Sequence, residues 1–242
     1  MDNGIYITLS RQLALFRDMD VTANNIANAN TTGYSSEHLL FTSYLKKDIN
    51  QRVTNPMAFA HDISTYRNTN TGSMKATGNA LDLAIDGDAY FSVETPLGTR
   101  YTRAGNFQVD PDGTLMTAEG YPVLDNAGQR ITFPEDTLDI QIGSAGNISV
   151  NGAEFAVLGV LEFENPQLLE RLSGTLYKSE VLPQPTETAR VLQGTLENSN
   201  VQPMREMTHM MDVSRSVGST AKLIETIYDL ERKAASVWAK QG

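Results

Sequence analysis

Few side chains of this 242-residue chain have the types and spacing that catalysis requires. The histidines are His38, His61 and His209, and no two of them have the close spacing of a metal-binding pair. Cysteine is absent, which excludes thiolate nucleophiles and Cys-based metal sites. The sequence contains no glycine-rich phosphate loop and no nucleophile elbow. The residue types therefore predict no enzyme, no cofactor and no metal.

Carboxylates are the remaining candidates for chemistry. Asp82 and Asp86 lie on the solvent side of an alternating strand pattern and Asp88 follows in a turn, so we expect a solvated face rather than a catalytic pair. The segment Asp110-Pro-Asp-Gly113 begins like a calcium-binding loop, but an EF-hand also needs a third acid, a later Glu and flanking helices. Because this segment separates two strand-like runs, it predicts a hairpin turn.

Charge is divided unevenly along the chain, whose formal net charge is −10. Residues 76–190 hold 17 acidic and 6 basic residues, whereas residues 1–75 come to +1 and residues 191–242 to 0. An acidic middle favours solvent and disfavours nucleic acid, whose binding depends on Lys and Arg neutralising phosphates. Near-neutral ends can approach copies of themselves without long-range repulsion. The distribution therefore indicates association through the ends and no nucleic-acid partner.

The sequence shows no ordinary membrane or export signal. No stretch approaches the roughly 20 apolar residues that a membrane-spanning helix needs. The opening residues, Met-Asp-Asn-Gly-Ile-Tyr, have neither a basic n-region nor a continuous apolar h-region. We therefore expect no direct membrane span and, if the chain leaves the cytoplasm, no cleaved secretory signal of the ordinary kind.

Both ends of the chain carry narrow apolar stripes with helical spacing. The N-terminal stripe steps by three, four or seven residues through Ile5, Leu9, Phe16, Met19, Ala23 and Ile26. The C-terminal stripe does the same through Met207, Met210, Val217, Ala221, Ile224, Tyr228, Ala235 and Trp238. A stripe of this width is typical of a coiled-coil seam rather than the broader face of a core helix. Because a small middle domain cannot cover two such seams, they indicate a subunit that packs into a larger assembly.

An asparagine cluster marks the end of the predicted N-terminal helix, which begins near Asp2 or Asn3. Its members are Asn24, Asn25, Asn28 and Asn30. One interpretation is a capped, frayed helix end. The other is lateral hydrogen bonding, because Asn24 and Asn28 share a helix face and an amide can both donate to and accept from an identical neighbour. The helix is expected to end near Asn30, with Gly33 in the left-handed conformation just beyond it.

Short β patterns separated by glycine-containing turns fill the middle of the chain and predict a barrel- or sandwich-like domain. The expected fold class is α+β: long N- and C-terminal coiled-coil-like helices flank a mostly antiparallel, all-β central domain. The predicted segments are an N-terminal assembly helix (1–34), an extended connector with a helical turn around Leu39–Lys47 (35–75), the β domain (76–190), a return linker (191–202) and a C-terminal assembly helix (203–242).

Four stretches of the sequence carry a family resemblance. They are Ala23-Asn-Asn-Ile-Ala-Asn-Ala-Asn-Thr-Thr-Gly-Tyr34, Thr77-Gly-Asn-Ala-Leu-Asp-Leu-Ala-Ile-Asp-Gly87, Tyr101-Thr-Arg-Ala-Gly-Asn-Phe107 and Gln193-Gly-Thr-Leu-Glu-Asn-Ser-Asn-Val201. The first resembles the N-terminal signature of the bacterial flagellar rod and hook proteins. The second and third resemble the start of the β domain of that family, and the fourth resembles its C-terminal entry motif. The opening residues, the length and the single β region look most like the proximal rod subunits of that family.

The resemblance implies a structural subunit of the flagellar basal-body rod in the periplasm, which self-assembles through its terminal helices to transmit motor torque. It implies copies of the chain and other rod subunits as partners, and passage in an unfolded state through the flagellar type III export apparatus. The assembly interface that it implies combines the two stripes, the Asn cluster and the C-terminal entry motif. Its residues are Leu9, Phe16, Met19, Ala23, Asn24, Asn25, Ile26, Asn28, Tyr34, Ser199, Asn200, Val201, Met207, Met210, Val217, Ala221, Ile224 and Tyr228.

One position departs from the pattern of this family, whose C-terminal helix often carries bulky residues after its Arg. Here Arg215-Ser-Val-Gly218 places a glycine in the middle of the predicted helix. A helix-interior glycine costs about 1 kcal/mol relative to alanine. It permits either close packing or a bend, and the sequence leaves both readings open.

Other functions remain as alternatives. Within the family, the nearest is a distal rod or hook-type subunit. A secreted β-domain hydrolase of cell-wall glycan has only the acidic middle in its favour, and it would need two carboxylates facing each other about 5–10 Å apart. A carbohydrate-binding module would need exposed aromatic residues on one sheet face, whereas Trp238, the single Trp, lies in the predicted C-terminal helix.

Overall fold

The structure is a computed structural model that describes residues 2–46, 57–186 and 188–241. Some residues singled out in the sequence have side chains outside the described part. They are Ile5, His61, Ala235 and Trp238.

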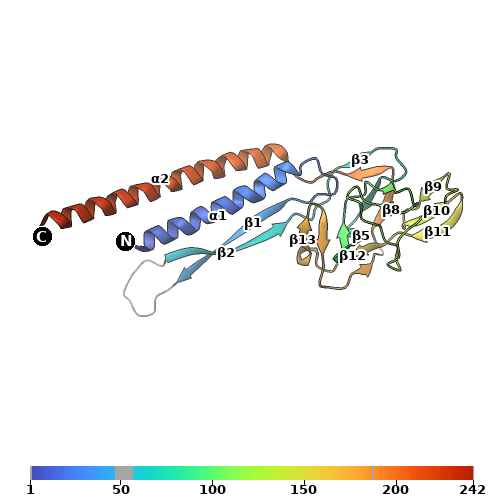
Figure 1. The fold of residues 1–242 in the computed structure, drawn as a ribbon, viewed down its shortest axis with the longest axis horizontal. Coiled ribbons are helices and arrows are strands. Elements are labelled where there is room, and N and C mark those ends of the chain that lie inside the picture. Colours follow the sequence, from blue (N-terminus) through green and yellow to red (C-terminus); the bar gives the residue numbers. More distant parts are fainter. Residues whose placement is uncertain (1, 47–56, 187, 242) are drawn as a thin grey trace. The chain divides into compact units, whose positions relative to one another are not determined.

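The chain forms two compact units (Figure 1). The helical unit comprises residues 1–27, 37–66 and 202–242. The β unit comprises residues 28–36 and 67–201. Each unit therefore combines segments that are far apart in the sequence, and the N-terminal and C-terminal parts of the chain meet within both.

The helical unit contains the helices α1 (Asp2–Ala27) and α2 (Pro203–Gln241), with the strands β1 (Glu37–Lys46) and β2 (Met57–Arg67), whose last residue belongs to the β unit. The two helices lie side by side and antiparallel, and β1 and β2 pair with each other next to α1 (Figure 1). The apolar spacing of three and four residues accounts for both helices. Of the helices that the structure describes, none is at once long enough and apolar enough to cross a bilayer.

Two local expectations differ from the structure. The first helix ends at Ala27 rather than near Asn30, and a turn follows in which the Thr31 hydroxyl donates to the Asn28 side chain at 3.1 Å. Asparagine competes for local hydrogen bonds in this way, which makes it a poor helix former. The helical turn expected around Leu39–Lys47 is wrong over its described residues, because Glu37–Lys46 is a strand. Its β-branched and aromatic residues suit a strand.

A six-stranded antiparallel sheet forms the largest part of the β unit, in the order β13-β14-β6-β5-β12-β15. Its strands are β5 (Ala89–Thr95), β6 (Gly98–Thr102), β12 (Val160–Glu162), β13 (Glu170–Ser173), β14 (Leu176–Lys178) and β15 (Gln184–Pro185), with a 3-10 helix at Pro166–Leu168. The smaller sheets join β9 (Ile140–Ile142), β10 (Asn147–Val150) and β11 (Ala153–Val157); β4 (Leu83–Asp86) and β16 (Arg190–Gln193); β3 (Met74–Ala76) and β17 (Thr195–Glu197); and β7 (Gln108–Val109) and β8 (Leu115–Met116). Together with the paired terminal helices, these strands confirm the predicted fold class.

The main hydrophobic core lies between the sheets of the β unit. It is formed by Leu83, Ile85, Ala89, Phe91, Val93, Phe107, Leu115, Val123, Ile131, Phe133, Ile142, Ile148, Val150, Leu158, Val160 and Val191. The alternation expected around β4 is wrong at Ala84, which is as fully buried as its neighbours Leu83 and Ile85. Leu83 and Ile85 point to one face of the strand and Ala84 to the other, and all three are fully buried. Strand β4 is therefore covered on both faces.

A second, aromatic cluster packs on the six-stranded sheet. It comprises Tyr90, Tyr101, Phe163, Leu169 and Tyr177. The ring of Tyr90 meets the rings of Phe163 and Tyr177 edge to face, each with centroids 5.8 Å apart. Burial raises the pKa of the Tyr90 hydroxyl, so this group stays neutral at physiological pH.

The core makes a matched prediction about two leucines of the β unit. Leu83 is fully buried, so Leu83→Ala should lower the free energy of unfolding by about 2–5 kcal/mol through lost contacts and a residual cavity. Leu138 is 94% exposed, so Leu138→Ala should change it by less than about 0.5 kcal/mol. Urea denaturation of the full chain measures both. Equal losses in the two variants would contradict the placement of the core.

Candidate assembly site

The carboxylates considered for catalysis lie at the two ends of β4: Asp82 precedes the strand, Asp86 is its last residue and Asp88 follows it. Asp86 and Asp88 are exposed, and the half-buried Asp82 accepts a hydrogen bond from the Asn79 amide at 3.1 Å. His38 is exposed on β1. Within the described part of the chain, no three His, Cys, Asp or Glu side chains are placed to hold a metal ion.

The segment Asp110-Pro-Asp-Gly113 connects β7 and β8 and is the hairpin turn that the sequence predicts. The Asp110 carboxylate accepts backbone N–H groups of Asp112 at 3.0 Å and Thr114 at 2.7 Å. Gly113 adopts a φ of +82°, which glycine tolerates without strain. The Asp110 carboxylate therefore shapes a turn.

A buried ion pair in the β unit ties the motif at Tyr101–Phe107 to the C-terminal entry motif. Arg103 Nε lies 2.8 Å from Glu197 Oε2, and their side chains are only 4% and 6% exposed. Arg103 also donates to the Gly87 carbonyl at 2.9 Å, and the Gly72 N–H donates to Glu197 Oε1 at 2.9 Å. The backbone carbonyl of Glu197 accepts the N–H of Gly33 at 2.8 Å. Both buried charges thus have the partners that their desolvation requires.

Asn200 bridges two further segments of the β unit with its side-chain amide. Its Oδ1 accepts the N–H of Ser36 at 2.7 Å, and its Nδ2 donates to the carbonyls of Asn68 at 2.9 Å and Asn70 at 2.7 Å. Its own N–H donates to the Tyr34 carbonyl at 3.2 Å. The Asn200 side chain therefore holds the segment that follows α1 and the segment that follows β2 next to each other.

Tyr34 is buried beneath a guanidinium group within the β unit. Arg171 lies 4.2 Å above the Tyr34 ring, a cation–π geometry, and also donates to the carbonyl of Ser35 and to the hydroxyl of Tyr177 at 3.2 Å. The preceding Gly33 has a φ of +66°, which confirms the left-handed conformation predicted there. A Cβ at Gly33 would collide with the backbone that follows β6. These contacts hold the end of the Asn-rich motif in one conformation.

Asn25 is the buried member of the Asn cluster: it belongs to the helical unit, and only 1% of its surface is exposed to solvent. Its Oδ1 accepts the N–H of Glu37 at 3.1 Å, and its Nδ2 donates to the Glu37 carbonyl at 2.8 Å. The same Nδ2 lies 3.2 Å from Oε2 of Glu206, which is buried in the first turn of α2. One amide therefore connects α1, the start of β1 and the start of α2.

The α1–α2 contact has a second polar tie, because His209 Nε2 lies 3.1 Å from the Asp18 carboxylate. Among the described side chains of α1, the fully buried ones are Ala14, Thr22 and Asn25. Ala14 and Asn25 lie opposite the predicted stripe, and Thr22 lies next to it, four residues before Ile26. On α2 the positions turned into the unit repeat every three or four residues. They are the buried Glu206, Val213 and Thr220 and the half-buried Met210, Val217, Ile224 and Ile227. The fully buried positions of α1 are thus small or polar, whereas the inward side of α2 combines Val, Ile and Met side chains with Glu206 and Thr220.

The structure divides the predicted interface residues into three groups. The exposed ones are Leu9, Phe16, Ala23, Asn24, Met207, Ala221 and Tyr228. The half-buried ones are Met19, Ile26, Asn28, Asn200, Met210, Val217 and Ile224. The buried ones are Asn25, Tyr34, Ser199 and Val201. Sequence reasoning missed Glu37 and Glu206, and the seven-residue interval between Glu206, Val213 and Thr220 is the signal that could have revealed the inner seam of α2.

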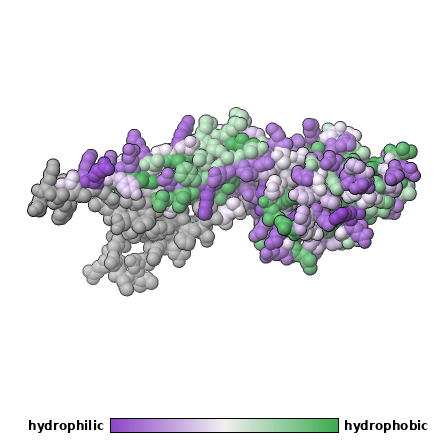
Figure 2. All heavy atoms as spheres, viewed as in Figure 1, coloured by the Kyte–Doolittle hydropathy of each residue, from purple (hydrophilic) through white to green (hydrophobic). Residues whose placement is uncertain are grey.

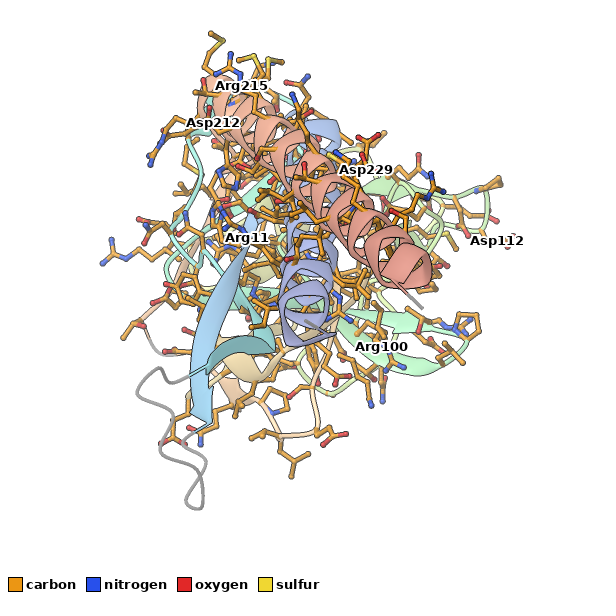
Figure 3. All side chains as sticks on the ribbon, turned by 90° about the vertical axis from the view of Figure 1, so that its left-hand side faces the viewer. Arg11, Arg100, Asp112, Asp212, Arg215 and Asp229 are labelled. Carbon is orange, nitrogen blue, oxygen red and sulfur yellow. The ribbon has the colours of Figure 1, made fainter. Side chains whose placement is uncertain are left out.

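Apolar side chains remain on the surface of the helical unit. Figure 2 shows them on the visible face of this unit, interspersed with hydrophilic residues. The exposed fractions of Leu9, Leu13 and Phe16 are 46%, 56% and 40%, and those of Met204 and Met211 are 76% and 52%. Other exposed positions are charged: Asp212 and Arg215, labelled in Figure 3, extend from α2 with most of their surface in solvent. The arrangement suits packing against other protein surfaces better than it suits catalysis.

Both ends and the middle of the chain match models of flagellar rod and hook protein families. Residues 5–34 match the model of the flagella basal body rod protein, residues 84–150 that of the flagellar hook protein FlgE/F/G D1 domain, and residues 192–237 that of the flagellar basal body rod FlgEFG protein C-terminal region.

Relatives match over nearly the whole chain. The chain is 38% identical over 237 residues to the flagellar basal-body rod protein FlgF of Caulobacter vibrioides, covering 97% of each chain. It is 34% identical to FlgF of Rhizobium meliloti, covering 94% of this chain and 98% of the relative. It is 33% identical to the rod protein FlgG of Bacillus subtilis, covering 93% and 95%. The chain therefore belongs to the flagellar basal-body rod protein family, as an FlgF-like, non-enzymatic structural subunit of the proximal rod.

Proposed function

We propose that this rod subunit self-assembles through its two terminal segments, residues 1–34 and 203–242, and that the resulting shaft transmits torque from the flagellar motor. Its partners are copies of itself and the adjacent rod proteins. Before assembly, the chain passes unfolded through the flagellar type III export apparatus. A single observation carries the proposal: the described side chains of the helical unit include few buried apolar ones and many exposed apolar ones.

The small size of that core can be stated from burial. In the described part of the helical unit, the fully buried apolar residues are Ala14 and Val213, whereas the β unit buries two clusters of large side chains. Two helices whose described side chains bury so little apolar surface are marginally stable alone, because helical stability in proteins comes mostly from packing of an apolar face. Packing against neighbouring subunits would bury the exposed side chains and provide the missing stability.

The interface residues then act in two ways. We propose that the exposed ones, such as Leu9, Phe16 and Met207, contact neighbouring subunits directly. The buried ones, such as Asn25 and Tyr34, position the helices through contacts inside their own unit. The acidic β domain, residues 76–190, is the solvent-facing spacer, since its net negative charge disfavours close packing of many copies through that part.

The proposal predicts the effect of a charge in the exposed stripe of α1. Phe16 is 40% exposed, so Phe16→Asp should leave the thermal unfolding of the β unit unchanged, while the burial of a carboxylate in a subunit contact blocks assembly. Phe16→Leu keeps an apolar side chain and serves as the control. Sedimentation of purified protein and swimming of cells that carry each variant measure the outcome. Normal assembly and swimming with Phe16→Asp would count against the proposal.

A second prediction concerns the Asn25 bridge. Asn25→Asp replaces the donor near Glu206 by a carboxylate at about the same place, so two negative charges meet where the observed distance is 3.2 Å. The variant should lose helical content, measured by circular dichroism, and swimming. Adding Glu206→Gln restores a donor and should recover part of both.

Asn24→Asp is the matched control for this pair, because Asn24 is exposed on the same helix turn. It should change helical content little. If Asn25→Asp behaves like Asn24→Asp, or if Glu206→Gln recovers nothing, the bridge does not hold the helices in the way proposed.

A further inference from the structure

The outward sides of both helices carry a second pair of stripes with the three- and four-residue spacing of a packing seam. On α1 the stripe consists of Leu9, Leu13, Phe16, Asp20, Ala23 and Ala27, all exposed. On α2 it consists of Met204, Met207, Met211, Ser214, Gly218 and Ala221, also all exposed. Each stripe has bulky side chains at one end and small ones at the other.

The two stripes are graded in opposite senses along the bundle. The helices are antiparallel, with Asp18 beside His209 and Asn25 beside Glu206, and each rises about 1.5 Å per residue. By this register Leu9 and Leu13 lie level with residues about 214–222 of α2. Ala23 lies level with residues about 204–208. The bulky end of α1 is therefore level with Ser214 and Gly218, and the bulky end of α2 is level with the alanines of α1.

Gly218 has no role inside the protomer that requires glycine. A Cβ built there meets no described atom within 4 Å, and its φ lies outside the left-handed region. A glycine in a helix interior is nevertheless destabilising relative to alanine. Small residues at such positions let a second helix approach closely, which favours the close-packing reading of Gly218 over the bend.

We infer that the occupant of these stripes is a second copy of this chain, whose α1 stripe packs on the α2 stripe of its neighbour at the same axial level. Leu9 and Leu13 of one copy fill the space left by Ser214, Gly218 and Ala221 of the next. Met204 and Met207 of that neighbour fill the space over Ala23 and Ala27. Phe16 meets Met211 at the middle of the seam, a favourable sulfur–aromatic contact.

The grading excludes a shifted alignment of the two stripes. A displacement by a few turns in one direction would place the leucines on the methionines, where they would clash, and a displacement in the other direction would place the alanines on Gly218, where they would leave a void. The stripes therefore specify axial register as well as contact. The charged positions next to the seam are Asp20 on α1 and Lys222 and Glu225 on α2. Asp20 lies level with residues about 207–211 of α2, whereas Lys222 and Glu225 lie level with residues about 2–9 of α1, so these charges do not oppose each other.

The pairing joins two different surfaces and so repeats from copy to copy. A heterologous contact of this kind produces a ring or a helical array, whereas α1-on-α1 or α2-on-α2 pairing would end at a dimer and leave the other stripe uncovered. The inference rests on the proposed self-assembly of the subunit. It specifies which faces of the helices meet, that α1 of one copy packs on α2 of the next, and at which axial register they do so.

Cysteine cross-linking tests the inference directly, because the chain has no cysteine of its own. Chains carrying Leu13→Cys and chains carrying Gly218→Cys are purified separately, mixed, assembled and oxidised, so that any disulfide between the two variants joins different copies. A disulfide needs Cα atoms within about 7 Å, which only the proposed seam provides for this pair. We expect a strong cross-linked dimer.

Two further mixtures are the controls. Ser219→Cys is exposed next to Gly218 but lies about 100° further round the helix, so its mixture with Leu13→Cys should cross-link several-fold less. Equal yields for Ser219→Cys and Gly218→Cys, or preferential linkage of Leu13→Cys to Ala23→Cys chains, would overturn the seam, the latter in favour of α1-on-α1 pairing. Failure of the unsubstituted chain to sediment as polymer at any concentration would instead overturn the proposed self-assembly.

A size exchange tests the register independently of any disulfide. Gly218→Leu fills open space in the monomer, so it should fold, but it should raise the concentration needed for assembly roughly tenfold or more by overpacking the seam. Combining it with Leu13→Ala should reverse much of that rise. Gly218→Leu that assembles like the unsubstituted chain, or a double variant no better than Gly218→Leu alone, would overturn the size matching.

Discussion

The apolar surface of the two terminal helices exceeds what their own unit can bury, and most other features of the chain follow from this imbalance. Among the described side chains of α1, the fully buried ones are small or polar, namely Ala14, Thr22 and Asn25. The larger side chains, such as Leu13 and Phe16, point outward. A coiled coil formed only within the protomer would be expected to reverse this distribution. The β unit, by contrast, buries two clusters of large apolar side chains.

Polar contacts determine where the termini meet. In the helical unit, Asn25 forms hydrogen bonds with the N–H and the carbonyl of Glu37 and with the Glu206 carboxylate. In the β unit, Asn200 and the Glu197–Arg103 ion pair likewise connect segments that are distant in the sequence. Buried polar groups of this kind contribute little net stability, but a misaligned chain would leave them unsatisfied, so they penalise wrong arrangements. In a subunit whose helices are weakly held by apolar contacts, that penalty selects the correct pairing of α1 with α2.

The sequence predicted the features that depend on local pattern and missed those that depend on packing. The helices, the β domain, the Asp110 turn and the left-handed Gly33 follow from periodicity and turn chemistry, and the structure has them. Apolar spacing alone could not tell which stripe of a helix faces inward, because α1 and α2 each carry two. The strand at Glu37–Lys46 and the burial of Ala84 arise from neighbours distant in the sequence. The role of Asn25 depends on Glu206, 181 residues away, which no local pattern can reveal.

Hydrogen–deuterium exchange of the monomer and of the assembled protein tests the central claim most directly. If neighbouring subunits supply the stability that the helical unit lacks, amides of residues 7–27 and 203–230 should exchange fast in the monomer and become strongly protected on assembly, because local opening free energy reports local stability. Amides of the β core around Phe91 and Leu115 should be protected equally in both states. Helices already as protected in the monomer as in the assembly would contradict the account.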